Sequence, residues 1–229
     1  SGPPMSRITS RRTLKKGFLS GALQKPDAEK LTEVWPGHMF YFRQASKHGQ
    51  CLADWTGEAF SSQTMRDDAQ QELSTCIRFS AEEAKKHRYG LTPDSMELSG
   101  IAGWYVRNFM TPKDVMGKSF RSQGISMYSA QAKEGAGWII ITSESGSVAD
   151  LIETGRRFER MALMVREMDI ALHPMTQILE EKKWRDQTSS MHKQGLLPQL
   201  VLRVGYVSKY PDPVSIRRPV DWFLYTYAG

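Results

Sequence analysis

Two apolar segments rich in β-branched residues lie in the second half of this 229-residue chain, on either side of a long helical pattern. Trp138–Thr142 and Gln199–Tyr206 have the composition that is typical of interior strands. Between them, apolar residues recur every three or four positions from Val148 to Val165, which predicts a helix of about five turns with Ser147 as its N-cap. Alternating strands and helices restrict the chain to a mixed α/β or α+β fold.

The first half of the chain predicts more helix than strand. A helix is expected from near Pro26 to just before Pro36, because proline is tolerated in the first helical turn. Met39–Arg43 is a candidate for a short aromatic strand. From Ser46 to Phe79 the pattern predicts two helices, with a break near Ser61-Ser62.

The middle of the chain has the weakest pattern. Tyr89 to Gly135 is rich in Gly, Pro, Ser and Met and contains one weak helix, Ile101–Phe109. We expect this segment, residues 89–135, to be an irregular excursion or lid within a single domain that spans residues 1–229. The last segment, Pro219–Tyr227, is predicted to be an aromatic strand or an extended tail.

The composition narrows the classes of function. Apolar residues make up 40% of the chain and charged residues 24%, which is typical of a globular protein. A net charge of +6 favours anionic partners such as a phosphate-bearing cofactor, a nucleic acid or an acidic surface. No apolar run approaches the roughly 18 to 20 residues of a membrane span, so no membrane partner is expected. Two widely separated cysteines form no disulfide framework, which suggests a reducing, cytoplasmic location.

Motifs for several enzyme classes are missing from the sequence. It contains no Gly-x-Gly-x-x-Gly, no phosphate-binding Gly-Lys-Ser loop, no His-Glu-x-x-His and no Gly-x-Ser-x-Gly. We therefore expect no catalytic side-chain nucleophile. The histidines are scattered, so no metal site is expected from His38, His48, His87, His173 and His192.

Three segments, in this order and separation, resemble the flavin-dependent nitroreductase family. They are Arg11-Arg12-Thr13-Leu14-Lys15, then Ala171-Leu172-His173-Pro174-Met175 after the long helix, and finally Leu202-Arg203-Val204-Gly205-Tyr206 followed by Ser215-Ile216-Arg217-Arg218-Pro219-Val220. The chain is most similar to the C-terminal half of the subfamily in which two nitroreductase-like halves are fused, and Arg88-Tyr89-Gly90-Leu91 also resembles that subfamily. The resemblance implies an α+β fold with a mixed, mainly antiparallel sheet flanked by helices.

The resemblance also implies a cofactor, FMN, at the interface of two protomers or of two fused halves. In the family, arginines from both ends of one half hold the flavin phosphate, and a guanidinium fork suits that anion. For either basic cluster taken alone, a solvated face remains the alternative. The implied phosphate contacts are Arg11, Arg12, Thr13, Lys15, Arg217 and Arg218.

The segment His173-Pro174-Met175-Thr176 falls where the family has a loop beside the flavin ring. Such a loop offers a backbone amide or a side chain that tunes the flavin by hydrogen bonding. Pro174 and Met175 are favoured as ring contacts, whereas His173 could be an ordinary capping or surface histidine. The family's flavin-gripping segment of small residues is missing after Trp35-Pro36-Gly37, so a second protomer or a companion half is expected to supply it.

The function implied by the resemblance is NAD(P)H-dependent reduction of nitroaromatic or quinone acceptors through FMN. One alternative is a catalytically silent protein that binds or stores flavin, or a half-domain that needs its companion. The aromatic and methionine-rich stretch from Leu91 to Tyr128 motivates that alternative, because a lid over the flavin would block nicotinamide docking. A nucleic-acid partner is not expected, because acidic residues interleave with the arginines of the long helix.

Overall fold

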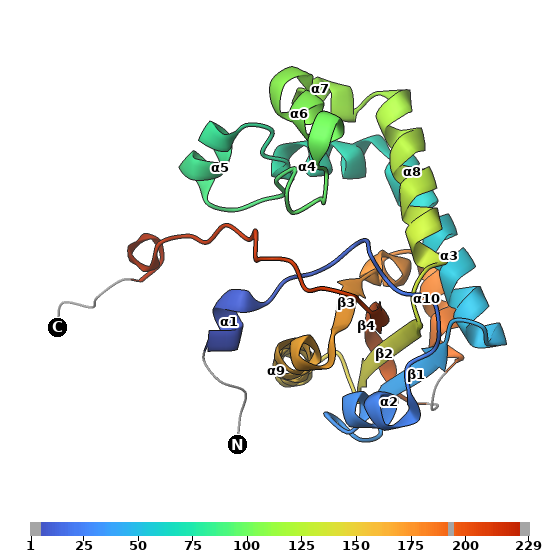
Figure 1. Cartoon of the computed structure of the whole chain (residues 1–229). Coiled ribbons are helices and arrows are strands. Elements are labelled where there is room, and N and C mark those ends of the chain that lie inside the picture. The colour runs from blue at the N-terminus through green and yellow to red at the C-terminus, as the bar shows by residue number, and fades with distance from the viewer. Residues whose placement is uncertain (1–5, 192–194, 225–229) are drawn as a thin grey trace. The chain divides into compact units, whose positions relative to one another are not determined.

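The computed structural model describes residues 6–191 and 195–224, and the chain divides into two compact units. Unit 1 comprises residues 1–65 and 122–213, and unit 2 comprises residues 66–121 and 214–229. Figure 1 labels the α-helices and strands of both units. The expectation of a single domain over residues 1–229 stays a prediction.

Unit 1 holds the sheet and the helices that cover it. Its helices are α1 (Ser6–Ser10), α2 (Lys25–Thr32), α3 (Lys47–Met65), most of α8 (Lys118–Ala132), α9 (Val148–Met164) and α10 (Lys182–Ser189), with the 3-10 helices η1 (Val165–Met168) and η2 (Thr176–Leu179). Its strands are β1 (Met39–Arg43), β2 (Gly137–Ser143), β3 (Ile170–Pro174) and β4 (Leu197–Tyr206). Unit 2 contains α4 (Asp67–Cys76), α5 (Ala81–His87), α6 (Gly100–Phe109), α7 (Pro112–Val115), the start of α8 and the 3-10 helix η3 (Val220–Trp222).

The four strands form one sheet in the order β1-β2-β4-β3, and every neighbouring pair is antiparallel. The predicted strands at residues 39–43, 138–142 and 199–206 are confirmed. The prediction of a loop at His173-Pro174 is wrong, because both residues pair with β4 as the end of β3. Asp169, at a φ of 49°, turns the chain after η1 so that β3 can join the edge of the sheet.

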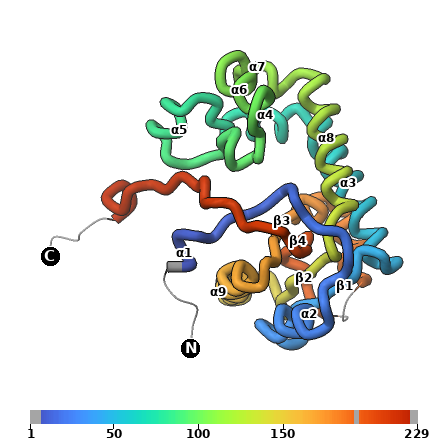
Figure 2. The backbone as a smooth tube through the Cα atoms, viewed as in Figure 1, coloured from blue at the N-terminus to red at the C-terminus, as the bar shows by residue number. Residues whose placement is uncertain are grey.

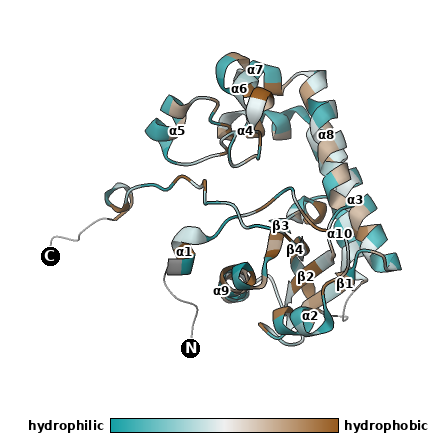
Figure 3. Ribbon diagram, in the orientation of Figure 1, coloured by the Kyte–Doolittle hydropathy of each residue, from teal (hydrophilic) through white to brown (hydrophobic). Residues whose placement is uncertain are grey.

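Alternate residues of the strands pack against two separate layers of helices, which explains why β2 is buried at all seven positions. Ile139, Ile141 and Val204 belong to a core cluster with residues of α2 and α9. Trp138 and Ile140 belong to a second cluster with residues of α3, α8, η2 and α10. Figure 3 shows hydrophobic residues concentrated in these strands.

The structure confirms one predicted helix boundary and contradicts another. Ser147 caps α9, since its hydroxyl accepts a hydrogen bond from the amide of Asp150, as predicted. The predicted break near Ser61-Ser62 is wrong, because α3 continues to Met65 and ends at Arg66, whose backbone is extended. The helix continues through Ser61 and Ser62 because serine has only a modestly unfavourable helix propensity, and because contacts of α3 with the sheet stabilise the helix.

The prediction of irregular structure over residues 89–135 is also wrong. The segment contains α6, α7 and α8, and the weak helix expected at Ile101–Phe109 is confirmed as α6. Tyr128 and Ala132 of α8 lie in the core of unit 1, so tertiary packing stabilises a helix whose own pattern is weak. A lid role for this segment stays a prediction.

The prediction of an aromatic strand or extended tail at the C-terminal segment is confirmed only in part. Residues 220–222 form η3 and not a strand, and residues 225–227 of the predicted Pro219–Tyr227 segment lie outside the described residues. His192 also lies outside them.

Unit 2 has its own small core, made by Ile77, Phe79, Val106 and Val115 with partly buried neighbours. At one edge of this core, the side-chain amide of Gln70 donates to the carbonyl of Val115 at 2.8 Å.

None of the helices within the described ranges combines the length and the apolar character that a bilayer crossing needs.

We predict that Gly137→Ala destabilises unit 1 by about 1 to 3 kcal/mol, because an added Cβ would lie 2.2 Å from the backbone oxygen of Phe42. Gly155→Ala is the control, since nothing lies within 4 Å of a Cβ there and alanine favours the α9 helix by about 0.5 to 1 kcal/mol. Urea unfolding measures both changes. A Gly137→Ala variant as stable as the wild type would contradict the close approach of β1 and β2.

Candidate functional site

The basic opening of the chain runs antiparallel beside the segment that follows β4. Leu19 donates its amide to the carbonyl of Tyr206 at 2.8 Å, and Phe18 forms an antiparallel bridge with Val207. Further along, the Nη1 of Arg12 donates to the carbonyl of Asp212 at 2.5 Å. Figure 2 shows the blue N-terminal tube beside the red segment after β4. The first arginine pair therefore lies next to the chain that leads toward the second pair.

A buried leucine fixes this arm to the sheet. Leu14 lies in the middle of the basic run, yet only 2% of it is exposed. It packs with Ala171 and Val207, and Phe18 and Tyr210 lie against the same cluster. The arm is therefore a packed element and not a freely solvated basic face.

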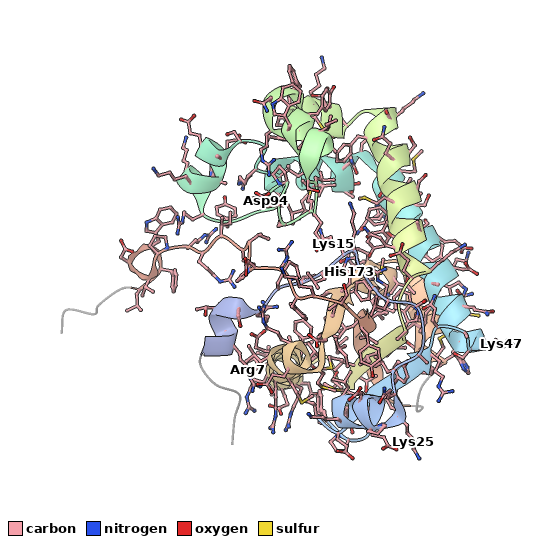
Figure 4. All side chains as sticks on the ribbon, viewed as in Figure 1. Arg7, Lys15, Lys25, Lys47, Asp94 and His173 are labelled. Carbon is pink, nitrogen blue, oxygen red and sulfur yellow. The ribbon has the colours of Figure 1, made fainter. Side chains whose placement is uncertain are left out.

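Arg203 of β4 ties the arm to the core. It is fully buried, and its Nη2 donates to the carbonyl of Lys15 at 2.8 Å. The same nitrogen lies 3.1 Å from Nδ1 of His173, while Nη1 donates to the carbonyl of Gln131. The centre of the Phe18 ring lies 4.1 Å from the guanidinium carbon. Figure 4 labels Lys15 and His173, which lie near each other.

The free-energy cost of burying the Arg203 charge is offset by these acceptors and by one carboxylate. Glu134 Oε2 lies 3.6 Å from Nη1. Because an uncompensated buried charge costs several kcal/mol, the carbonyls and this carboxylate must stay in place. Sequence reasoning assigned Arg203 no role, although a basic residue between Leu202 and Val204 of an apolar strand was the available signal.

His173 is buried opposite Arg203 in the β3–β4 register, with only 4% of it exposed. Because a guanidinium only donates, Nδ1 of His173 accepts and the ring proton lies on Nε2. Burial, the Arg203 charge and the Lys15 charge lower the pKa of His173 to about 2. The imidazole is therefore neutral, and the alternative of a surface histidine is wrong.

Met175 is fully buried with Trp138 in the core, and its amide donates to the carbonyl of Val201 at 2.9 Å. The hydroxyl of Thr176 accepts from the amide of Val201 at 3.3 Å. Pro174 is half-buried at the end of β3. The polar groups of Met175 and Thr176 are therefore hydrogen-bonded within unit 1. The flavin-ring contacts of Pro174 and Met175 stay predictions.

The remaining phosphate candidates of the arm differ in their surroundings. The Nε of Arg11 lies 3.2 Å from Glu159 Oε1 of α9, and 30% of the Arg11 side chain is exposed. Thr13 and Lys15 are half-buried.

The second arginine pair belongs to unit 2, in a stretch without helix or strand. Arg217 and Arg218 are both exposed. Arg88 donates its Nε to the carbonyl of Arg217 at 2.9 Å, and the Arg218 guanidinium lies 4.1 Å from the centre of the Tyr89 ring. Because the two arginine pairs lie in different units, their meeting around one anion stays a prediction.

Unit 1 also has an open cavity of about 840 Å³, in the size range of small-molecule sites. Phe18 and Glu134, which both contact Arg203, belong to its wall, but none of the predicted flavin contacts does. Among the residues that the structure describes, no group of three metal-ligating side chains is placed to hold an ion.

The fold is similar to that of solved nitroreductases. A nitroreductase-like family protein from Bacillus cereus aligns with a TM-score of 0.55 and 12% identity, over 98% of this chain and 95% of its own. A nitroreductase with bound FMN from Desulfitobacterium hafniense gives a TM-score of 0.56 and 9% identity, over 97% and 96%. A variant of an FMN- and NADPH-dependent nitroreductase from Sphigopyxis gives 0.53 and 11%, over 98% of both chains.

No protein-family model and no curated protein matches the sequence. The structural similarity, at these low identities, establishes an α+β, nitroreductase-like fold over nearly the whole chain. The fold expectation drawn from the three sequence segments is therefore confirmed.

We predict that His173 makes the protein less stable in acid. Folded His173 stays neutral, whereas unfolded histidine protonates near its usual pKa of about 6.5, so the unfolded state binds more protons below that pH. Between about pH 7 and pH 5, the wild type should lose about 2 kcal/mol more unfolding free energy than His173→Gln does.

Urea unfolding at the two pH values measures this difference. His48→Gln is the control, because it makes the same substitution at an exposed histidine. An equal pH dependence in His173→Gln and the wild type would contradict the burial of a neutral imidazole.

Proposed function

We propose that this chain is an FMN-dependent oxidoreductase of the nitroreductase type. When bound, FMN would accept a hydride from NAD(P)H and pass electrons to a nitroaromatic or quinone acceptor. Two solved chains of the same fold are described as FMN-bound or FMN-dependent, and one of them as NADPH-dependent, which supports the choice of cofactor. A cytoplasmic location is part of the proposal.

One observation from this chain carries the proposal: the packed arm places Arg12 against the carbonyl of Asp212. Arg217 follows Asp212 by five positions, and even a fully extended chain spans only about 18 Å over five positions. The covalent chain therefore keeps the second arginine pair within reach of the first. A phosphate with nearly two negative charges needs several charge-assisted hydrogen bonds, which the two pairs can supply together.

The residues of unit 1 would bind and orient the cofactor. Arg11, Arg12, Thr13 and Lys15 would contact the phosphate from the arm, while Arg203 holds the backbone of that arm through the Lys15 carbonyl. The end of β3, at Pro174, would lie beside the flavin ring. Neutral His173 would add no charge there, because its imidazole accepts from Arg203. No side chain of this set acts as a nucleophile in the proposal.

A second copy of the chain or a companion half would complete the site. The family's segment of small residues that grips the flavin is missing after Trp35-Pro36-Gly37, so another polypeptide must supply that contact. The likeness to the C-terminal half of the fused subfamily favours a companion half, and a homodimer is the simpler alternative because it needs no other protein.

A catalytically silent flavin-binding or storage protein is the second candidate. The observation that favours it is the exposed aromatic face of α6, which carries Trp104, Tyr105 and Phe109, each more than half exposed. An aromatic face that covered the flavin would exclude nicotinamide while still retaining the cofactor.

We predict that purified protein, after addition of FMN, shows flavin absorbance that bleaches when NADPH is added without oxygen. Bleaching reports hydride transfer, which the enzyme needs and the storage protein lacks. Absorbance spectra before and after NADPH, with free FMN as the control, make the measurement. A yellow protein that resists both NADPH and NADH would support storage, and a protein that never retains FMN would contradict both candidates for the chain alone.

We predict that the double variant Arg217→Ala/Arg218→Ala binds FMN at least tenfold more weakly, because even one lost charge-assisted hydrogen bond to the phosphate contributes roughly 1.5 to 3 kcal/mol. Quenching of flavin fluorescence gives the dissociation constant. The matched control is Arg156→Ala/Arg160→Ala, which removes two exposed arginines from α9. Unchanged affinity in the first double variant would refute the phosphate assignment.

A further inference from the structure

The segment Arg88-Tyr89-Gly90-Leu91 has no role in the function proposed above, yet it forms a hydrogen-bonded turn in unit 2. Arg88 ends α5 in the left-handed region at a φ of 57°, and its amide donates to the carbonyl of Ala84. Leu91 exchanges backbone hydrogen bonds with the preceding strand-like segment, at 2.7 Å to Arg78 and 2.8 Å to Cys76. The turn is therefore fixed at both ends.

Buried Arg78 holds this turn from beneath. Only 7% of Arg78 is exposed, and its Nε donates to the carbonyl of Tyr89 at 3.0 Å. Its guanidinium carbon also lies 4.8 Å from the centre of the Tyr89 ring. Gly90 has no room for a side chain, since an added Cβ would lie 2.4 Å from the carbonyl oxygen of Cys76. The ring of Tyr89 is thus a supported platform at the surface.

The second arginine pair rests on this platform. Arg217 is held through its backbone by the Nε of Arg88, and the Arg218 guanidinium stacks on the Tyr89 ring at 4.1 Å. The stretch that carries the pair has no helix or strand, so these two contacts set where the arginines lie. A guanidinium that stacks through its face keeps its N–H donors in the plane, where they can bind an anion.

The two arginines differ in how many of their donors are already used. Arg217 donates Nη1 to the carbonyl of Ile216 at 3.3 Å. No described residue of unit 2 accepts a hydrogen bond from Arg218, although its guanidinium is held in place. Held orientation combined with unused donors is the arrangement that binds a phosphate at low entropic cost.

The charge around the platform favours the same ligand. A neighbouring cavity of about 300 Å³ in unit 2 has Arg88 and Ile216 in its wall. Its charged residues are four cations and one acid, and the acid, Asp94, is paired with Arg107 at 2.5 Å. The remaining positive field raises the local concentration of an anion.

We infer that Tyr89 and Arg88 are positioning residues, and that they present the Arg218 guanidinium to a phosphate monoester. The inference rests on the proposed function for the identity of that ester, the flavin phosphate. Tyr89 acts through the face of Arg218, and Arg88 acts through the backbone of Arg217.

Dissociation constants for FMN and riboflavin test this inference in the full chain. Arg218→Ala should weaken FMN binding about tenfold or more and leave riboflavin unchanged, whereas Arg217→Ala should change FMN binding less than threefold, because Arg217 acts through its backbone. Tyr89→Leu should weaken FMN binding about two- to fivefold, and Tyr89→Phe should restore it because the phenyl ring keeps the stacking.

A double-mutant cycle separates positioning from a general structural effect. Tyr89→Leu should have no further effect in the Arg218→Ala background, since Tyr89 acts only through that guanidinium. Phe223→Leu is the matched control, because Phe223 is an exposed aromatic residue of unit 2 and no arginine of the described residues lies over its ring. The inference is overturned by additive effects, by failure of phenylalanine to restore affinity, or by equal losses for FMN and riboflavin.

The outcome also separates this inference from the proposed function. If the wild type binds FMN and Tyr89→Leu and Arg218→Ala do not change the affinity, the platform is wrong and the flavoprotein proposal stands. If the wild type does not bind FMN, the flavoprotein proposal fails, and phenyl phosphate becomes the probe. Binding of phenyl phosphate that Arg218→Ala abolishes would then support the platform, and no such binding would overturn it.

Discussion

The buried guanidinium of Arg203 is the interaction on which the rest of unit 1 depends. It joins three parts of the sequence that are far apart: the N-terminal arm through Lys15 and Phe18, the end of α8 through Gln131, and the edge strand β3 through His173. A fully buried cation is tolerated only where acceptors surround it. Each of these segments is therefore held in place because it supplies a partner to the same guanidinium. The arm is basic and would otherwise be solvated. Arg203 and the buried Leu14 together turn it into a packed element of unit 1.

The same charge explains the neutral histidine beside it. Nδ1 of His173 accepts from Arg203, and a positive neighbour in a buried site opposes protonation of the ring. In the proposed flavin site, the arm and the C-terminal segment would supply positive charge to the phosphate, and the end of β3 would supply a neutral, packed wall beside the ring. Separation of a charged end from a neutral end is what an amphipathic mononucleotide requires.

Local sequence patterns predicted three of the four strands and the long helix α9. The strands at residues 39–43, 138–142 and 199–206 and the helix that begins after Ser147 were readable because their apolar periodicity and capping are local. The strand β3 and the helix α8 were missed, since their formation depends on pairing with β4 and on packing of Tyr128 and Ala132 into a distant core. Family resemblance supplied the basic ends of the site. Its motifs include Arg203 and Tyr89 but indicate no role for either residue, because these roles arise from contacts with residues more than a hundred positions away in the chain.

A crystal structure of the chain with FMN, together with any companion that it needs, tests the central claim most directly. We expect the flavin phosphate to lie within hydrogen-bond distance, about 3 Å, of guanidinium nitrogens from both the Arg11-Arg12 arm and the C-terminal Arg217-Arg218 pair. A phosphate held by only one of these pairs, or bound elsewhere on the protein, would contradict it.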